Sequence, residues 1–187
     1  LGPEVIELEE KLASYVGSNH CISCSSGTDA LLMSLMASGI SKNDAVITSP
    51  FSYIATAEVI ELLGAKVYFC DINDQTFNLD CSNLDSIVKQ ISDDGLNLKA
   101  LISVDIFGLP ARYRVLEKFC KDREIILIED MAQSFGSSIR DKKAGNFGEF
   151  SATSFFPSKP LGCYGDGGAI FTNSDEYAEI LRSIRVH

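Results

Sequence analysis

Strand-like and helix-like segments alternate along almost the whole chain, and this alternation restricts the fold more than any other feature. Short apolar runs such as Ile125–Glu129 (IILIE) have the length and residue types of buried strands. The segments between them carry apolar residues at helical spacing. Such a chain is expected to fold as an α/β domain, with a mainly parallel central sheet, right-handed crossovers and helices on both faces.

The expected elements can be placed from these patterns and from turn residues. We expect helices at 3–16, 28–38, 54–63, 84–92, 113–123 and 175–184, and strands at 20–25, 45–48, 66–71, 100–105, 125–129, 152–156 and 169–172. Pro3 marks the first helix start, and Gly39 and Gly64 mark helix ends. Ligands bind at the carboxyl ends of the strands in sheets of this kind, so polar residues just past a strand are the candidates.

Charge and hydropathy exclude several classes of protein. The 187 residues carry a formal charge of −10 without a Lys/Arg stripe, which argues against nucleic acid or an anionic membrane as a partner. No apolar run has the length of a membrane span, and no charged-then-apolar leader opens the chain, so a cytoplasmic location is expected. The chain lacks an initiator Met and stops just after a helical pattern, so we expect a piece of a longer protein.

Lys159 lies between an apolar Phe-Phe-Pro and a Pro-Leu-Gly, where Pro157 and Pro160 restrict the backbone on both sides. An amine in semi-apolar surroundings loses hydration, which favours its neutral form. A neutral amine can attack a carbonyl and form a Schiff base. Covalent attachment of a carbonyl cofactor is therefore one interpretation, and an ordinary surface-loop lysine is the other.

A phosphate site is predicted where the strand at 20–25 meets the next helix. Gly27 allows a tight turn, and the first helical amides are unpaired and partly positive, so Gly27 and Thr28 can hold a phosphate. Ser154, on the strand before Lys159, can reach the same group. The alternatives are an ordinary helix cap by Ser26 or Thr28 and a small strand residue at 154.

Asp130 follows a strongly apolar strand and should be buried where ligands bind. A buried carboxylate needs a cationic partner, and a protonated pyridine nitrogen would serve. Gln133 lies one turn further on and can donate to a ring oxygen, whereas Tyr53 or Phe51, past the strand at 45–48, can stack on a flat ring. The alternatives are helix capping by Asp130 and core packing of the aromatic rings.

Cys21 and Cys24 have the C-x-x-C spacing of metal and redox sites. A zinc ribbon needs a second such pair, which this sequence lacks, so no metal site is expected. The alternative interpretation is two small apolar residues on a buried strand. A truncated or regulatory domain that uses this pair is the non-enzymatic hypothesis.

The four strand-end sites together match the requirements of pyridoxal phosphate: a phosphate cradle, a partner for the pyridinium, a stacking ring and a lysine amine. The runs Ser26–Leu31 (SGTDAL), Ile128–Gly136 (IEDMAQSFG) and Ser154–Ala169 (SFFPSKPLGCYGDGGA) resemble the nucleotide-sugar aminotransferases of the DegT/DnrJ/EryC1/StrS family, which are fold type I pyridoxal-phosphate enzymes. The resemblance covers essentially the whole chain. Residues 1–187 would form the large cofactor-binding domain, without the C-terminal small domain.

The resemblance also implies roles for these residues. Lys159 would hold the cofactor covalently and later shuttle a proton, and Asp130 would pair with the pyridine nitrogen. Gln133 would bond the ring hydroxyl oxygen, Tyr53 is a better match than Phe51 to the family's stacking position, and Gly27, Thr28 and Ser154 would hold the phosphate. The family completes this phosphate site with an asparagine from the second subunit of a homodimer, and that asparagine lies beyond this chain.

The implied activity is transfer of an amino group from an amino acid, expected to be glutamate, to a nucleotide-linked ketosugar in the biosynthesis of bacterial surface polysaccharide such as lipopolysaccharide O-antigen. Some dehydratases in the family replace the lysine with histidine and cannot transaminate. Lys159 argues against that branch, and dehydration of a sugar nucleotide remains the alternative reaction.

Overall fold

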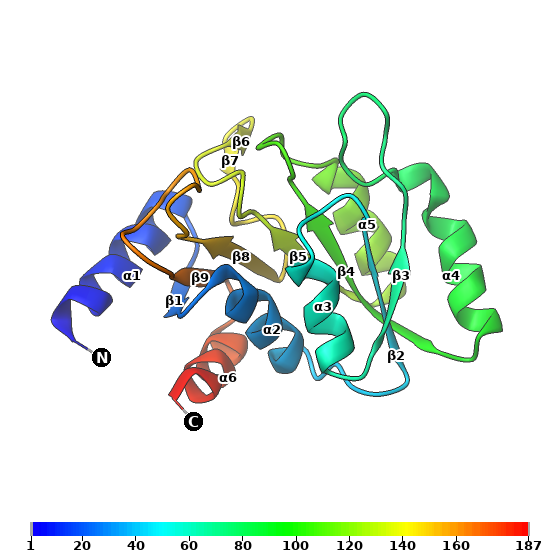
Figure 1. Cartoon of the computed structure of the whole chain (residues 1–187), viewed down its shortest axis with the longest axis horizontal. Helices are drawn as coiled ribbons and strands as arrows, with labels where there is room; N and C mark the ends of the chain where they lie inside the picture. Colours follow the sequence, from blue (N-terminus) through cyan, green and yellow to red (C-terminus); the bar gives the residue numbers. More distant parts are fainter. Residues whose placement is uncertain (1, 187) are drawn as a thin grey trace.

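Buried residues follow one another along the central strands of one seven-stranded sheet, so both faces of the sheet are covered. Figure 1 shows this sheet and the helices that flank it. The computed structural model describes residues 2–186, so the two terminal residues of the predicted 1–187 domain lie outside the described part. The strands of the sheet are β1 (His20–Cys24), β2 (Asp44–Thr48), β3 (Lys66–Phe69), β4 (Asn97–Val104), β5 (Ile126–Asp130), β8 (Phe150–Ser154) and β9 (Gly168–Thr172).

The strand order is β1-β9-β8-β5-β4-β2-β3. Strands β8, β5, β4, β2 and β3 pair in parallel, and β9 pairs antiparallel with both β1 and β8. The loop of residues 155–167 joins β8 to β9 without a helical crossover, which explains why β9 runs in the opposite direction. The loop therefore leaves and rejoins the sheet at one edge, where the carboxyl ends of the parallel strands also lie.

Six helices cover the two faces of the sheet: α1 (Pro3–Val16), α2 (Gly27–Ala37), α3 (Ala55–Leu62), α4 (Leu84–Asp93), α5 (Tyr113–Arg123) and α6 (Asp175–Val186). Helices α2, α3 and α6 pack with Ile102 and Ile128 in one apolar cluster. Helices α4 and α5 pack with Leu101 and Leu127 in a second cluster, and α1 packs with Phe171 in a third. The expected α/β class, with a mainly parallel sheet and helices on both faces, is confirmed.

The predicted elements all exist, with boundaries that differ by up to three residues. The strand predicted at 100–105 begins at Asn97, and the strand predicted at 152–156 covers Phe150–Ser154 because Phe150 pairs with Ile128. The prediction missed the short β6–β7 hairpin (Ser138–Ile139 and Lys142–Lys143) and the 3-10 turn η1 (Cys81–Asn83). The hairpin turn contains Arg140 at a φ of 55°. Glycine or asparagine usually marks a turn with positive φ, and Arg140 gives no such signal in the sequence.

Glu129 is a fully buried carboxylate on the α5 side of β5. Its oxygens accept hydrogen bonds from the amides of Gly145 (2.9 Å) and Phe147 (3.2 Å) and from the hydroxyl of Ser151 (2.7 Å), so it fastens the segment before β8 to the sheet. Burial is the largest influence on this group and raises the pKa of Glu129 from 4.5 to about 7.

We predict that Glu129→Gln gains stability relative to the wild type as the pH rises. The raised pKa means that Glu129 contributes most to stability below pH 4.5, and that this contribution is lost as the pH rises through about 7. Gln keeps the shape but does not titrate, so the difference in unfolding free energy should shift toward the variant by on the order of 3 kcal/mol across this window. Chemical unfolding of both proteins at a series of pH values measures the shift, and a constant difference would contradict it.

Candidate active site

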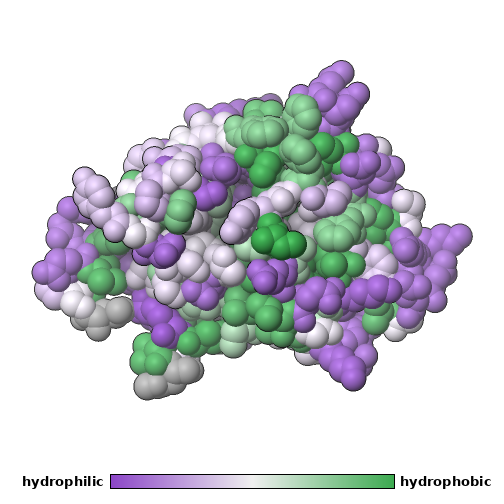
Figure 2. Space-filling model, in the orientation of Figure 1, coloured by the Kyte–Doolittle hydropathy of each residue, from purple (hydrophilic) through white to green (hydrophobic). Residues whose placement is uncertain are grey.

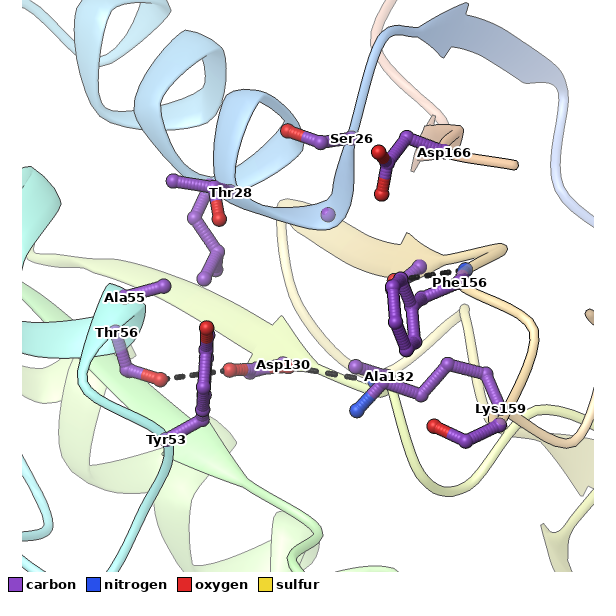
Figure 3. A pocket seen from close by; sticks show the side chains of 14 residues that line it. Ser26, Thr28, Tyr53, Ala55, Thr56, Asp130, Ala132, Phe156, Lys159 and Asp166 are labelled. Carbon is purple, nitrogen blue, oxygen red and sulfur yellow. Dashed lines mark hydrogen bonds between the residues drawn. The ribbon is translucent and has the colours of Figure 1, made fainter.

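A cavity of about 420 Å³ opens at the carboxyl edge of the sheet. It is lined by residues from four strand ends and from the loop between β8 and β9, namely Ser26, Gly27, Thr28, Leu31, Tyr53, Ala55, Thr56, Asp130, Ala132, Ser154, Phe156, Ser158, Lys159 and Asp166. Figure 3 shows Lys159 entering from the side opposite Thr56, with Asp130 between them. The parallel strands thus bring together groups that are up to 140 positions apart, counted from Ser26 to Asp166.

The cavity contains six of the seven predicted site residues. They are Gly27, Thr28, Tyr53, Asp130, Ser154 and Lys159. The structure does not bring the seventh, Gln133, into the lining, and its side chain is exposed. Phe51 also lies elsewhere, in an exposed aromatic cluster with Phe77 and Phe107, whose ring centroids lie 5.5–6.0 Å apart.

The turn between β1 and α2 caps the helix and also leaves amides that can bind an anion. Ser26 is the N-cap of α2, and its hydroxyl oxygen accepts a hydrogen bond from the amide of Asp29 at 3.0 Å. The amides of Gly27 and Thr28 come earlier in the helix, where no carbonyl of the same helix can accept them. These two amides and the positive end of the helix dipole are therefore suited to bind an anion at the cavity.

Gly27 and Ser154 approach each other so closely that a side chain at position 27 has no room. A Cβ atom on Gly27 would lie 2.6 Å from the Cβ of Ser154. The Ser154 hydroxyl oxygen accepts a hydrogen bond from the amide of Phe156 at 3.2 Å, which leaves its own proton free to donate (Figure 3). This corner of the cavity has the donors and the space for a phosphate group.

Asp130 is buried at the end of β5, on the face covered by α2 and α3. One carboxylate oxygen accepts a hydrogen bond from the Thr56 hydroxyl at 2.9 Å, and the other accepts one from the Ala132 amide at 3.3 Å (Figure 3). Burial raises the pKa of Asp130, while these two donors and the charge of Lys159 act in the opposite direction. A cation in the cavity would therefore gain a strong partner in Asp130.

Tyr53 lies just before α3, and Thr56 is the second residue of that helix; the Thr56 amide donates to the Tyr53 carbonyl at 3.2 Å. The Tyr53 side chain lines the cavity and is 72% exposed, so its ring offers a flat surface to a ligand. Thr56 is buried, and its hydroxyl oxygen also contacts the hydroxyl of Ser52 at 2.9 Å. Thr56 was not among the residues predicted from the sequence, because its partner Asp130 is remote along the chain.

Lys159 lies on a loop whose backbone is fixed at several points. The amide of Phe155 donates to the carbonyl of Gly167 at 2.7 Å, and the amide of Cys163 donates to the carbonyl of Phe155 at 2.7 Å. The Lys159 amide closes a turn on the carbonyl of Phe156 at 2.9 Å. The half-buried lysine side chain thus extends into the cavity from a defined backbone. Asp166 lies on the same loop and also lines the cavity with its carboxylate; it was not predicted from the sequence.

Cys21 and Cys24 do not form a paired site. Both are free thiols on β1, and their side chains join different apolar clusters on opposite faces of the sheet. Burial raises the pKa of both thiols, that of Cys24 to about 12. Within residues 2–186 there is no group of three or more His, Cys, Asp or Glu side chains placed to hold a metal ion. This geometry favours packing over a metal or redox role for the pair.

Known proteins with similar sequences were found over the whole length of the chain. The chain is 49% identical over 187 residues to UDP-2-acetamido-2-deoxy-3-oxo-D-glucuronate aminotransferase of Pseudomonas aeruginosa, a match that covers 100% of this chain and 50% of the relative. The chain spans about half the length of the curated relatives it matches.

Two solved structures show that the fold is shared. A DegT DnrJ EryC1 StrS aminotransferase from Brucella abortus superposes with a TM-score of 0.98 at 46% identity, over 100% of this chain and 50% of that one. A GDP-4-keto-6-deoxymannose-3-dehydratase with a trapped PLP–glutamate geminal diamine gives a TM-score of 0.90 at 31% identity, over 100% of this chain and 48% of that one. All residues of the chain, 1–187, match one family description, and the chain belongs to the DegT/DnrJ/EryC1/StrS aminotransferase family.

Proposed function

We propose that the protein binds pyridoxal phosphate and uses it to transfer an amino group from an amino acid to a nucleotide-linked ketosugar. The observation that carries this proposal is the shared cavity of Lys159, Asp130 and the Gly27–Ser154 corner. An amine, a buried carboxylate and an anion cradle are the three groups that this cofactor requires. They come from distant parts of the chain, and the parallel sheet brings them to one edge.

The cavity fits the cofactor by its shape and by its donors. A Cβ at position 27 would clash with Ser154, so glycine is required there, and the Gly27 amide stays open to a phosphate in the cavity. Asp130 has two neutral donors, from Thr56 and Ala132, so its charge remains available to a ring nitrogen. When bound, the protonated pyridine ring of the cofactor supplies an electron sink for the carbon that loses or gains a proton.

The residues of this chain then have separate roles. Lys159 would hold the cofactor covalently and, as a free amine, would take and return a proton at the reacting substrate carbon. Asp130 would favour protonation of the ring nitrogen, and Tyr53 would stack on the ring. Gly27, Thr28 and Ser154 hold the phosphate. Gln133 stays in the proposal as the donor to the ring hydroxyl oxygen, which requires its exposed side chain to turn toward the cavity.

The identity of the substrate rests on similarity. The Pseudomonas relative at 49% identity supports UDP-2-acetamido-2-deoxy-3-oxo-glucuronate as the ketosugar. The proposal includes a role in surface-polysaccharide biosynthesis such as that of O-antigen. The glutamate trapped on PLP in the related dehydratase structure supports glutamate as the amino donor. Another 3-keto or 4-keto nucleotide sugar is the alternative substrate.

The location and assembly of the protein complete the proposal. A cytoplasmic location fits the six cysteines, all of which are free. No helix in the described part of the chain has the length and hydropathy needed to span a bilayer. We also propose a homodimer that shares its active sites, because Lys159 is the only basic side chain among the described residues of the cavity lining. A partner subunit can supply the further polar contact to phosphate that the family resemblance implies.

The first prediction concerns covalent attachment. Borohydride reduction of the full-length protein with bound cofactor should fix the adduct on Lys159, and mass spectrometry of the digested protein locates it. Lys159→Ala should retain non-covalent binding and lose transamination, because the cavity keeps its other contacts. An adduct on another residue, or none, would contradict the proposal.

The same protein separates transamination from the alternative reaction, dehydration of the sugar. Incubation with glutamate and the ketosugar should yield an aminated sugar of unchanged hydroxyl count together with 2-oxoglutarate. A product that has lost water would favour the dehydratase activity of the solved relative.

The second prediction tests the partner of the ring nitrogen. Asp130→Asn removes the charge that faces the cavity, so cofactor affinity should fall by on the order of 100-fold, as for a broken buried ion pair. Thr56→Val is the matched control, because it removes one hydrogen bond to Asp130 and keeps the charge; its loss should be about tenfold or less. Equilibrium dialysis measures both. Unchanged affinity and absorption in Asp130→Asn would refute the pairing.

The third prediction concerns the phosphate corner. Gly27→Ala places a methyl group 2.6 Å from the Ser154 Cβ, so it should weaken binding of pyridoxal phosphate and leave the weaker binding of pyridoxal, which lacks the phosphate, nearly unchanged. Gly165→Ala is the control, since a Cβ there meets no atom within 4 Å. Titration of each variant with both compounds gives the comparison. Equal losses for both compounds would show that the phosphate does not bind here.

A further inference from the structure

Asp105 is a fully buried carboxylate just beyond β4, outside the cavity lining. Its two oxygens accept hydrogen bonds from opposite directions. The first accepts from the Ala111 amide at 2.9 Å and from the Tyr113 hydroxyl at 3.0 Å, at the start of α5. The second accepts from the Ser134 hydroxyl at 2.8 Å, in the turn that follows β5. One side chain therefore joins the β4–α5 loop to the turn that carries site residues.

The turn held by Ser134 is the one that sets the surroundings of Asp130. The Ser134 amide donates to the carbonyl of Met131 at 3.0 Å, which closes the turn around Ala132. The Ala132 amide is one of the two donors to the Asp130 carboxylate, and Ala132 itself lines the cavity. A displacement of Ser134 would thus move the amide that orients Asp130.

The backbones of the two loops also fit closely together. The Asp105 amide donates to the Asp130 carbonyl at 3.2 Å, which continues the pairing of β4 with β5 by one residue. Gly108 has a φ of +80°, and a Cβ at this position would lie 3.0 Å from the Gln133 carbonyl oxygen. The β4–α5 loop is therefore shaped to lie against the turn at 131–134, and Asp105 links the two by side chain and by backbone.

A carboxylate in this place is costly for the fold. Burial, followed by the nearby charge of Glu129, raises the pKa of Asp105 to about 8. The neighbouring Tyr113 ring stacks on Phe147 with centroids 4.4 Å apart, so apolar packing already holds α5 in this region. What packing does not supply is a directional link to Ser134, and buried polar networks of this kind specify one arrangement of the groups they join.

We propose that Asp105 is a positioning residue, which fixes the turn at 131–134 through Ser134 and so holds the Asp130 carboxylate in the orientation that binds the cofactor. This inference rests on the proposed function, because it assigns to Asp130 the role of the ring-nitrogen partner. Asp105 acts on the far face of the sheet from the cavity and touches no substrate.

Two variants with matched losses test this role. Ser134→Ala and Tyr113→Phe each remove one hydroxyl donor to Asp105, the first toward the site and the second toward α5. Both should lower the thermal midpoint of the cofactor-free, full-length protein, because each leaves the buried carboxylate with one bond fewer. Only Ser134→Ala should weaken binding of pyridoxal phosphate, by about tenfold, whereas Tyr113→Phe should stay within about twofold of the wild type.

The absorption spectrum of the bound cofactor gives a second reading that a merely structural role would not change. Ser134→Ala should shift the pH at which the cofactor band changes, since the orientation of Asp130 determines how strongly it holds the ring-nitrogen proton. Asp105→Asn keeps the shape and can hydrogen-bond Ser134 through its amide, so it should restore most of the affinity that Asp105→Ala loses.

Equal losses of affinity in Ser134→Ala and Tyr113→Phe, or an affinity of Ser134→Ala within about twofold of the wild type, would overturn the positioning role. Failure of Asp105→Asn to bind better than Asp105→Ala would also count against it. A wild-type protein that does not bind pyridoxal phosphate would instead overturn the proposed function, so the two failures are distinguishable.

Discussion

The parallel pairing of β8, β5, β4 and β2 is the constraint on which the site depends. Each parallel strand needs a return connection over the sheet, so every strand ends at the same edge. The sheet therefore gathers the start of α2, the start of α3, Asp130 and the Lys159 loop at one edge, although they are remote in sequence. In Figure 1 this edge lies between α2, α3 and the loop that joins β8 to β9, and Figure 2 shows hydrophilic and hydrophobic residues side by side over that region.

Strand β5 carries two adjacent carboxylates with opposite surroundings. Asp130 faces the cavity with two neutral donors, whereas Glu129 faces the α5 side, where its oxygens bind the amides of Gly145 and Phe147. The alternation of side chains along a strand separates the two by one residue. Asp130 thus presents its carboxylate to the cavity, whereas the oxygens of Glu129 are occupied by the protein. The distinction comes from the partners of each carboxylate and not from residue type.

Features that depend on a local residue pattern, or on the position of a strand end, could be predicted from the sequence. Six predicted site residues line one cavity because each lies at or shortly after the end of a strand whose direction could be predicted. Thr56 was missed because its hydrogen-bond partner, Asp130, lies 74 positions away. No local sequence pattern indicates a hydrogen bond between residues so far apart. Gln133 was expected inside the cavity from its helical spacing. The direction of its turn depends instead on the bond from Ser134 to Asp105, 29 positions apart, and on contact with Gly108.

The loop that bears Lys159 is hydrogen-bonded to itself at Phe155, Cys163 and Gly167, and both of its ends continue into paired strands. The main chain at position 159 is thus a fixed point. Any movement of the amine that the proposed chemistry requires must come from rotation about the bonds of the four-methylene side chain, which is far faster than a rearrangement of the backbone. The chemistry of this site can therefore run through several positions of one nitrogen atom without opening the sheet that holds it.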